Sequence, residues 1–229
     1  MIIEERNYKL RLPTFQFDEE TIRLHEQMAE EAERRKLQDE NARLVKSARI
    51  PDGYYRNLDT FIPDNESGVR ALSAVRDGIR KMCGMIVLLG GYGIGKSHLV
   101  CAALSEIIPL RKSVFGFAEP FSIRYVRSCE ICELYERAKG FSSDMTRTQV
   151  IDGFASYDVL VIDEVGRCGS AETEKEVLFR LTDARPNKLT FYVGNMNFHD
   201  FSVHLGGATM DRLRKADIVE MQGKSHRGM

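Results

Sequence analysis

The feature that most constrains this chain is a glycine-rich segment between a short apolar run and a stretch of helix-forming residues. The segment reads Gly90-Gly91-Tyr92-Gly93-Ile94-Gly95-Lys96-Ser97 and fits the pattern G-x-x-x-x-G-K-[ST]. Met85–Leu89 before it predicts a buried strand, and the residues after it predict a helix that ends near Ile108. Pattern and context together predict a phosphate-binding loop that joins a strand to a helix.

Each residue type in this loop has a chemical purpose. Glycines let successive backbone N–H groups converge on phosphate oxygens, and the N-terminus of the following helix adds partial positive charge. We expect Lys96 to reach the β- and γ-phosphates of a nucleotide, and the Ser97 hydroxyl to bind Mg²⁺. A dinucleotide-binding pattern, G-x-G-x-x-G, is excluded because Lys96 stands where its third glycine would be.

The rest of the chain alternates short apolar strands with helices. We predict strands at Ser122–Val126, Asp158–Ile162, Leu189–Val193 and Ile218–Met221, and helices at Glu130–Ala138, Glu172–Asp183 and Met210–Lys215. Apolar, β-branched strands that alternate with helices are typical of an α/β fold with a parallel sheet covered on both faces. The length of 229 residues suits one such domain with a short appendage.

The strand expected at residues 158–162 is followed by two carboxylates, Asp163 and Glu164. Because the carboxyl ends of parallel strands gather at one edge of a sheet, these acids are expected close to the glycine-rich loop. Asp163 would hold Mg²⁺ through its water shell, and Glu164 would orient and deprotonate an attacking water. A base beside the metal-binding carboxylate favours hydrolysis over phosphoryl transfer to a metabolite.

Polar residues in the last third of the chain suggest further roles. Asn195 follows a predicted strand and could hydrogen-bond the γ-phosphate or the attacking water, although asparagine is also a common turn residue. Arg212 and Arg214 suit either a solvated surface or an arginine finger that reaches the γ-phosphate of a neighbouring subunit. Asn187-Lys188 begins a guanine-reading pattern, but Thr190 stands where it requires Asp, which favours adenine.

Residues 18–46 form a highly charged segment without glycine or proline. Asp18 can cap its start, and its Glu, Lys, Arg, Gln and Ala residues favour a helix. Its apolar residues form a narrow stripe without a sustained heptad, so the helix cannot build a core of its own. A solvated surface helix and a partner-docking helix fit this pattern equally well.

Composition excludes several classes of protein. The 33 basic and 34 acidic residues exclude a polybasic nucleic-acid coat protein, and no apolar run is long enough to span a membrane. The start of the chain lacks the features of a signal peptide. The five cysteines are an odd number at irregular spacings, which indicates a reduced, cytoplasmic protein. Cys129-x-x-Cys132 has no second Cys or His pair at ligand spacing, so we expect no zinc site there.

Taken together, these segments resemble the DnaC/IstB group of AAA+ ATPases, which comprises helicase loaders and transposition helper ATPases. The resemblance rests on Ala48–Pro51 with Tyr54–Phe61, the loop with His98-Leu99, Asp158–Gly166, Gly194–Met196 and Met210–Arg214. It covers about residues 48–221. It implies an AAA+ core with a five-stranded parallel sheet flanked by helices, with the phosphate-loop strand at its centre. No C-terminal lid domain is expected, and the end of the chain soon after Met221 agrees with this.

The resemblance also implies roles for individual residues. The ATP-binding residues would be Gly90, Gly91, Tyr92, Gly93, Ile94, Gly95, Lys96, Ser97 and His98. Lys96 and Ser97 would be the Walker A pair, Asp163 and Glu164 the Walker B pair, Asn195 sensor 1, and Arg212 the finger that acts in trans. Ala208 occupies the position of a second trans arginine that relatives often carry, and whether Arg214 substitutes for it is open. Because the first cysteine is Cys83, the N-terminal zinc domain of some loaders is not expected.

The leading hypothesis is an ATP-dependent loader of a replicative DNA helicase, with ATP and Mg²⁺ as cofactors. Residues 1–50 would be a helical arm that docks on a hexameric, DnaB-like helicase, and residues 51–229 would be the AAA+ domain. That domain would form a homo-oligomer on ATP, bind single-stranded DNA and hydrolyse ATP. The alternative is an IstB-like transposition helper ATPase, while a small-molecule P-loop kinase is disfavoured by Glu164. Tyr55 or Phe61 would flank the adenine base.

Overall fold

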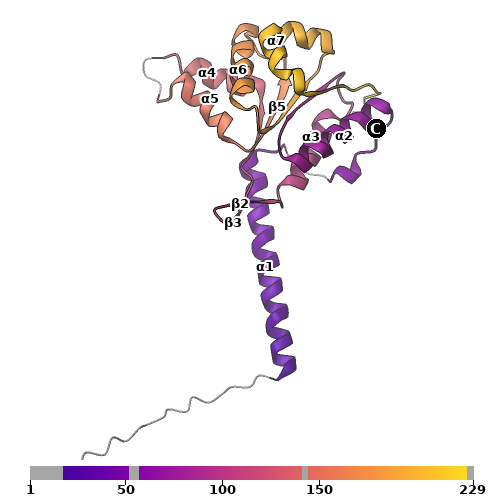
Figure 1. The fold of residues 1–229 in the computed structure, drawn as a ribbon, viewed down its shortest axis with the longest axis vertical. Helices are drawn as coiled ribbons and strands as arrows, with labels where there is room; N and C mark the ends of the chain where they lie inside the picture. Colours follow the sequence, from indigo (N-terminus) through magenta and orange to yellow (C-terminus); the bar gives the residue numbers. More distant parts are fainter. Residues whose placement is uncertain (1–17, 52–56, 141–143, 226–229) are drawn as a thin grey trace, which may run out of the picture. The chain divides into compact units, whose positions relative to one another are not determined.

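The computed structural model describes residues 18–51, 57–140 and 144–225 (Figure 1). The chain separates into two compact units, residues 1–40 and residues 41–229. The predicted N-terminal helix is confirmed as α1 (Glu19–Ala48), and the Asp18 carboxylate accepts a hydrogen bond of 2.7 Å from the Thr21 N–H at its start. Four large apolar side chains of α1 are exposed: Ile22, Leu24, Met28 and Leu37. Across the described residues, none of the helices is both long enough and apolar enough to span a membrane.

A five-stranded parallel sheet forms the centre of residues 41–229. Its strands lie in the order β4 (Ile123–Arg127), β5 (Val159–Val165), β6 (Leu189–Gly194), β1 (Met85–Leu89) and β7 (Asp217–Glu220). The prediction of a five-stranded parallel sheet is therefore confirmed. The expectation that the phosphate-loop strand is central is wrong, because β6 pairs with both β5 and β1 and takes the middle position. β1 is internal, with one strand beyond it.

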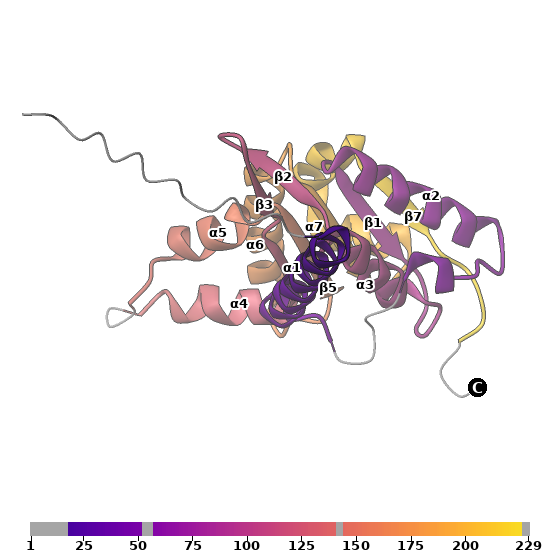
Figure 2. The ribbon, with the colours of Figure 1, turned by 90° about the horizontal axis from the view of Figure 1, so that it is seen from below.

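Helices cover both faces of this sheet (Figures 1 and 2). One face carries α2 (Glu66–Lys81) and α3 (Lys96–Ile107), and the other carries α4 (Ser128–Arg137), α5 (Arg147–Ser156), α6 (Ala171–Ala184) and α7 (Phe198–Arg212). Side chains alternate accordingly along β1, where Ile86 and Leu88 join the first core and Val87 and Leu89 join the second. The continuous apolar run of this strand reflects burial on both faces.

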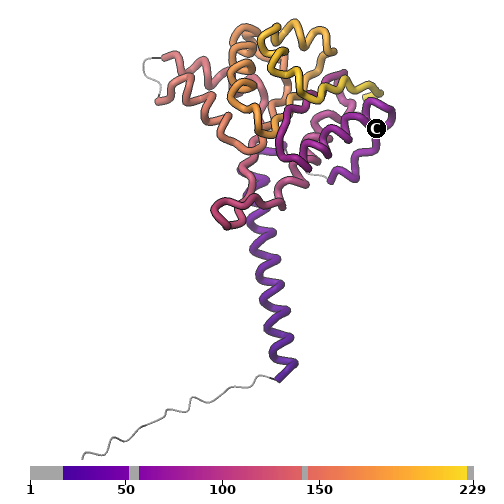
Figure 3. Tube along the Cα trace, viewed as in Figure 1, coloured from indigo at the N-terminus to yellow at the C-terminus, as the bar shows by residue number. Residues whose placement is uncertain are grey.

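Segments far apart in the sequence meet at the β7 edge of the sheet (Figure 3). α2 lies against β7, and Asn65, which caps α2, donates a hydrogen bond of 2.7 Å from Nδ2 to the Gln222 carbonyl. The same side chain accepts the Gly68 N–H at 3.1 Å. The segment directly after β7 is thereby tied to α2, the helix that precedes the glycine-rich loop.

The structure contains elements that the sequence patterns did not predict. They are α2, α5 and a separate antiparallel hairpin of β2 (Arg111–Val114) and β3 (Phe117–Pro120). The short helix expected at Met210–Lys215 is the end of the longer α7 followed by a 3₁₀ turn, Leu213–Lys215. Gly206 interrupts α7 with φ 75° and ψ 166°. This break explains why the sequence predicts a helix only after Gly206.

Candidate functional site

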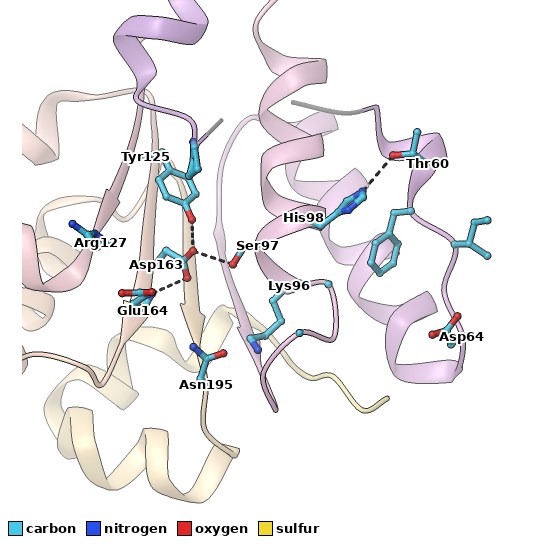
Figure 4. Close-up of a pocket in the computed structure, with 15 residues that line it drawn as sticks. Thr60, Asp64, Lys96, Ser97, His98, Tyr125, Arg127, Asp163, Glu164 and Asn195 are labelled. Carbon is cyan, nitrogen blue, oxygen red and sulfur yellow. Dashed lines mark hydrogen bonds between the residues drawn. The ribbon is translucent and has the colours of Figure 1, made fainter. Parts of the chain in front are cut away.

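A cavity of about 670 Å³ lies where the carboxyl ends of β1, β4, β5 and β6 meet (Figure 4). It is lined by Pro51, Thr60, Phe61, Ile62, Asp64, Gly93, Gly95, Lys96, Ser97, His98, Tyr125, Arg127, Asp163, Glu164 and Asn195. This edge is where ligands bind in open α/β sheets. Segments as distant in sequence as Thr60 and Asn195 contribute to one cavity.

The glycine-rich loop has a backbone that other residues could not adopt without strain. Gly90 has φ 127°, and a Cβ there would lie 2.2 Å from the Met221 carbonyl oxygen. Gly95 has φ 94°, and a Cβ there would lie 3.2 Å from the Phe61 ring. α3 begins directly after Gly95, so the positive end of its dipole lies at the loop. The loop is therefore shaped for close approach of an anion.

Lys96 is held inside this loop. It is 4% exposed, and its Nζ donates hydrogen bonds to the carbonyls of Gly90 at 2.9 Å and Gly91 at 2.6 Å. Tyr92 lies at the outer turn of the loop and is 55% exposed, whereas Ile94 is buried in the core. The nine residues that we predicted to bind ATP thus divide between cavity-lining positions and positions that shape the loop.

Three neutral groups hold the carboxylate of Asp163, which is 6% exposed. Ser97 Oγ donates to Asp163 Oδ2 at 3.0 Å, and the Tyr125 hydroxyl donates to the same oxygen. The Glu164 N–H donates to Asp163 Oδ1 at 2.7 Å. Figure 4 shows these contacts between β4, β5 and the start of α3.

An irregularity in β5 directs these acids into the cavity. The register of β5 against β6 shifts between Ile162 and Val165, and Glu164 has φ 57°, in the left-handed region. A bulge of this kind redirects side chains near active sites, and a non-glycine residue in this region costs roughly 1–3 kcal/mol. The strand therefore carries local strain at Glu164, the carboxylate predicted to act on water.

The residues present suit a magnesium ion. The Ser97 hydroxyl and the Asp163 carboxylate provide two hard oxygen donors 3.0 Å apart at the end of the phosphate loop. Mg²⁺ usually takes one or two protein oxygens and completes its shell with phosphate oxygens and water. Among the residues that the structure describes, no group of three or more His, Cys, Asp or Glu side chains could hold a metal by itself. A metal here would therefore depend on the bound nucleotide.

The structure brings most of the predicted residues together, but not Arg212. Asn195 follows β6 and lines the same cavity as Glu164. Arg212, at the end of α7, is not among the residues that line this cavity. Its Nε donates to Asp183 Oδ1 at 2.6 Å, and its guanidinium lies 4.2 Å from the centre of the Phe179 ring. Arg212 therefore lies on the surface formed by α6 and α7, away from the cavity of its own chain.

Several cavity residues were missed by the sequence patterns. They are Pro51, Thr60, Ile62, Asp64, Tyr125 and Arg127. Phe61, one of the two aromatic candidates for the adenine pocket, lines the cavity, and its ring centre lies 6.1 Å from that of His98. Thr60 Oγ1 lies 3.3 Å from His98 Nε2. The other candidate, Tyr55, is outside the described residues.

Glu174 on α6 is a further residue that the sequence patterns missed. Its side chain is fully buried, and it accepts the Gly166 N–H at 3.0 Å and contacts His204 Nε2 at 2.8 Å. Gly166 follows the two carboxylates by two residues, and His204 lies on α7. Glu174 therefore ties the loop after β5 to α7.

Comparison with known proteins identifies the family of this chain. The sequence profile of the IstB-like ATP binding proteins matches residues 21–229. The replicative helicase loader DnaC of Escherichia coli strain K12 is 25% identical over 165 residues, which cover 69% of this chain and 62% of that protein. An ATP-binding protein of insertion sequence IS232 from Bacillus thuringiensis subsp. berliner is 27% identical over 149 residues, which cover 62% of this chain and 55% of that protein. The chain thus spans between about half and three-fifths of the length of the curated relatives it matches.

Solved structures show the same fold. A crystal structure of the DnaC helicase loader matches 75% of this chain and all of that chain, with a TM-score of 0.59 and 20% identity. The replication initiator DnaA bound to AMPPCP and single-stranded DNA matches 77% of this chain and 52% of that chain, with a TM-score of 0.58 and 17% identity. These likenesses show that the chain shares its fold with these two proteins. Because the family profile covers nearly the whole chain, this protein belongs to the IstB-like ATP-binding proteins.

Proposed function

We propose that this chain is an ATP-dependent loader of a replicative DNA helicase that acts in the cytoplasm. The observation that carries the proposal is one cavity that contains Lys96, Ser97, Asp163, Glu164 and Asn195. These residue types are what ATP binding and hydrolysis require. The curated relatives include proteins named as replicative helicase loaders, which favours this function for the ATPase.

Within the cavity, each residue has a proposed role. Lys96 and the loop N–H groups bind the phosphates, and Ser97 and Asp163 hold Mg²⁺. When bound, Mg²⁺ would neutralise charge that develops on the phosphate oxygens. Glu164 takes a proton from the attacking water, and Asn195 orients that water or the γ-phosphate. The adenine base would lie against Phe61, beside Thr60 and His98.

Lys96→Ala is expected to weaken ATP binding by at least about 10- to 100-fold, because a charge-assisted bond to phosphate is lost. The substitution also removes the donor to the carbonyls of Gly90 and Gly91 that holds the loop in shape. Titration of a fluorescent ATP analogue would measure the affinity. Lys81→Ala, at an exposed position on α2, serves as the control and should bind like the wild type. Unchanged ATP affinity in Lys96→Ala would contradict the assignment of this segment as a phosphate-binding loop.

We further propose that ATP hydrolysis takes place between subunits. Arg212 is accessible on the surface. Its side chain is 35% exposed, and the side chain of its partner Asp183 is 58% exposed. An exposed ion pair of this kind contributes little to stability and can exchange partners readily. In a head-to-tail assembly the Arg212 guanidinium could leave Asp183 and reach the γ-phosphate of a neighbour, where it would stabilise charge in the transition state.

A mixture of Lys96→Ala and Arg212→Ala chains should recover ATPase activity that neither variant has alone. One variant supplies an intact cavity and the other an intact arginine, so random equal mixing restores roughly a quarter of the interfaces. Steady-state ATPase at a series of mixing ratios measures this. A mixture of Lys96→Ala with Arg80→Ala, an exposed arginine paired with Asp77 on α2, should instead follow simple dilution of an active chain. Zero activity at every ratio of the first mixture would contradict action in trans.

The arm at residues 1–50 is proposed to dock on the helicase. Along the described part of α1, exposed Ile22, Leu24 and Met28 provide apolar contacts within a polar helix. A net charge of −1 predicts weak binding of single-stranded DNA by one copy, so useful affinity would require several subunits along one strand. Weak binding of DNA by one copy therefore favours a homo-oligomer, which we propose forms on ATP binding.

The second candidate, an IstB-like transposition helper ATPase, is favoured by the family profile and by the IS232 relative. Affinity capture with Glu164→Gln in the presence of ATP separates the two, because a hydrolysis-deficient chain should retain its partner. Recovery of a hexameric helicase supports the loader, and recovery of a transposase supports the alternative. Leu24→Glu with Met28→Glu should release a helicase docked on the arm without loss of ATP binding.

A further inference from the structure

Tyr125 on β4 is an unexpected partner of the proposed metal-binding carboxylate. The side chain is 7% exposed, lines the cavity, and donates its hydroxyl to Asp163 Oδ2. A phenol is protonated at neutral pH, so the Tyr125 hydroxyl serves as a hydrogen-bond donor to this carboxylate.

The hydrogen bonds to Asp163 fix the orientation of its carboxylate. A carboxylate oxygen has two lone pairs, and those of Oδ2 are engaged by Tyr125 and by Ser97. Oδ1 accepts the Glu164 N–H and keeps one lone pair. Rotation of the carboxylate would break all of these bonds at once. Because Ser97 gives its proton to Asp163, the lone pairs of its own oxygen remain available to a cation.

A second buried tyrosine shows what a purely structural hydroxyl looks like in this sheet. Tyr192 on β6 is fully buried in the opposite core, and its hydroxyl lies 2.8 Å from Thr182 Oγ1, a neutral group. Tyr125 instead places its hydroxyl on a buried acid at the edge of the cavity. A phenylalanine would fill the same space, so packing alone does not account for the hydroxyl.

We propose that Tyr125 is a positioning residue for Mg²⁺, which holds Asp163 in the orientation that leaves Ser97 and Asp163 open to the ion. This inference rests on the proposed function, because it assumes that these two residues take the metal. The Tyr125 hydroxyl would not touch the ion or the nucleotide. Hydrogen-bond partners of metal ligands contribute substantially to metal affinity by fixing ligand orientation.

Mg²⁺ titration of nucleotide binding tests the role. The full chain and its variants Tyr125→Phe, Tyr192→Phe and Asp163→Asn would be titrated with a fluorescent ATP analogue, first in EDTA and then at rising Mg²⁺. Tyr125→Phe should raise the Mg²⁺ concentration at half-maximal effect by about 10- to 100-fold. Its affinity in EDTA and its kcat at saturating Mg²⁺ should stay close to the wild type. Tyr192→Phe should leave the Mg²⁺ midpoint unchanged.

The variants separate failure of this inference from failure of the proposed function. If Asp163→Asn shifts the Mg²⁺ midpoint and Tyr125→Phe does not, Tyr125 has no positioning role and the metal site stands. If Asp163→Asn also leaves the midpoint unchanged, the metal assignment itself is overturned. Equal losses of affinity in EDTA for both tyrosine variants, with unshifted midpoints, would reduce Tyr125 to a structural residue.

Discussion

Glu164→Gln is expected to bind ATP with nearly wild-type affinity and to hydrolyse it roughly 10²–10⁴-fold more slowly. Glutamine has the shape of glutamate and can still hydrogen-bond a water, but it cannot accept the proton that the water must lose. The left-handed φ of 57° at this position places the same cost on either residue, so the loop should keep its conformation. The defect should therefore appear in the chemical step and not in binding.

Single-turnover hydrolysis of radiolabelled ATP, with every chain saturated by nucleotide, isolates this step. Glu172→Gln, which removes an exposed acid from the first turn of α6, is the matched control and should hydrolyse ATP at the wild-type rate. Near-normal turnover in Glu164→Gln would show that Glu164 is not the catalytic base. A parallel loss of ATP affinity would indicate instead that the residue shapes the cavity.

Arg185→Met is expected to destabilise the chain by about 3–5 kcal/mol, because it removes a buried cation that serves many acceptors. Arg185 is fully buried at the end of α6. Its guanidinium donates to the carbonyls of Phe154, Ala155, Tyr157, Asp158 and Leu189 and to the Thr190 hydroxyl. These groups belong to the end of α5, to the two residues before β5 and to the start of β6. Without Arg185, several buried carbonyls would lose a donor while the strands that carry the site lose a common anchor.

Urea unfolding at neutral pH would measure this loss. Burial lowers the pKa of Arg185 to about 10, so the guanidinium remains charged under these conditions. Arg180→Met, an exposed position on the same helix, should change the free energy of unfolding by less than about 0.5 kcal/mol. Arg185→Lys, which retains the charge but fewer donors, should fall between the two. An unfolding midpoint for Arg185→Met equal to that of the wild type would refute the anchoring role.

The fold could be predicted wherever a local pattern decides it. Met85–Leu89 is apolar throughout and bounded by a glycine-rich loop, and its predicted limits match the strand. α2 also has a local signal, because Asn65 caps it and Glu66 stands in its first turn, although our prediction does not include this helix. The β2–β3 hairpin is short and largely exposed, so it lacks the apolar alternation that marks a strand. Strand order is set by packing between distant segments, which is why the central position of β6 was missed.

The residues of the candidate site also differ in whether a local sequence pattern marks them. The phosphate loop and the Asp163–Glu164 pair are contiguous in sequence, so their chemistry could be inferred before their neighbours were known. Tyr125 and Arg127 belong to the site because β4 lies beside β5, with Arg127 opposite Asp163 in the register. That pairing is a property of the folded sheet. The bulge that redirects Asp163 and Glu164 likewise arises only when β5 pairs with β6.

The proposal that this cavity binds and hydrolyses ATP is tested most directly by a crystal structure of the Glu164→Gln chain grown with ATP and Mg²⁺. We predict the triphosphate along residues 93–97, the metal ion between Ser97 Oγ and the Asp163 carboxylate, and the adenine base against Phe61. Nucleotide bound outside this cavity, or a metal ion held without Ser97 and Asp163, would contradict the account.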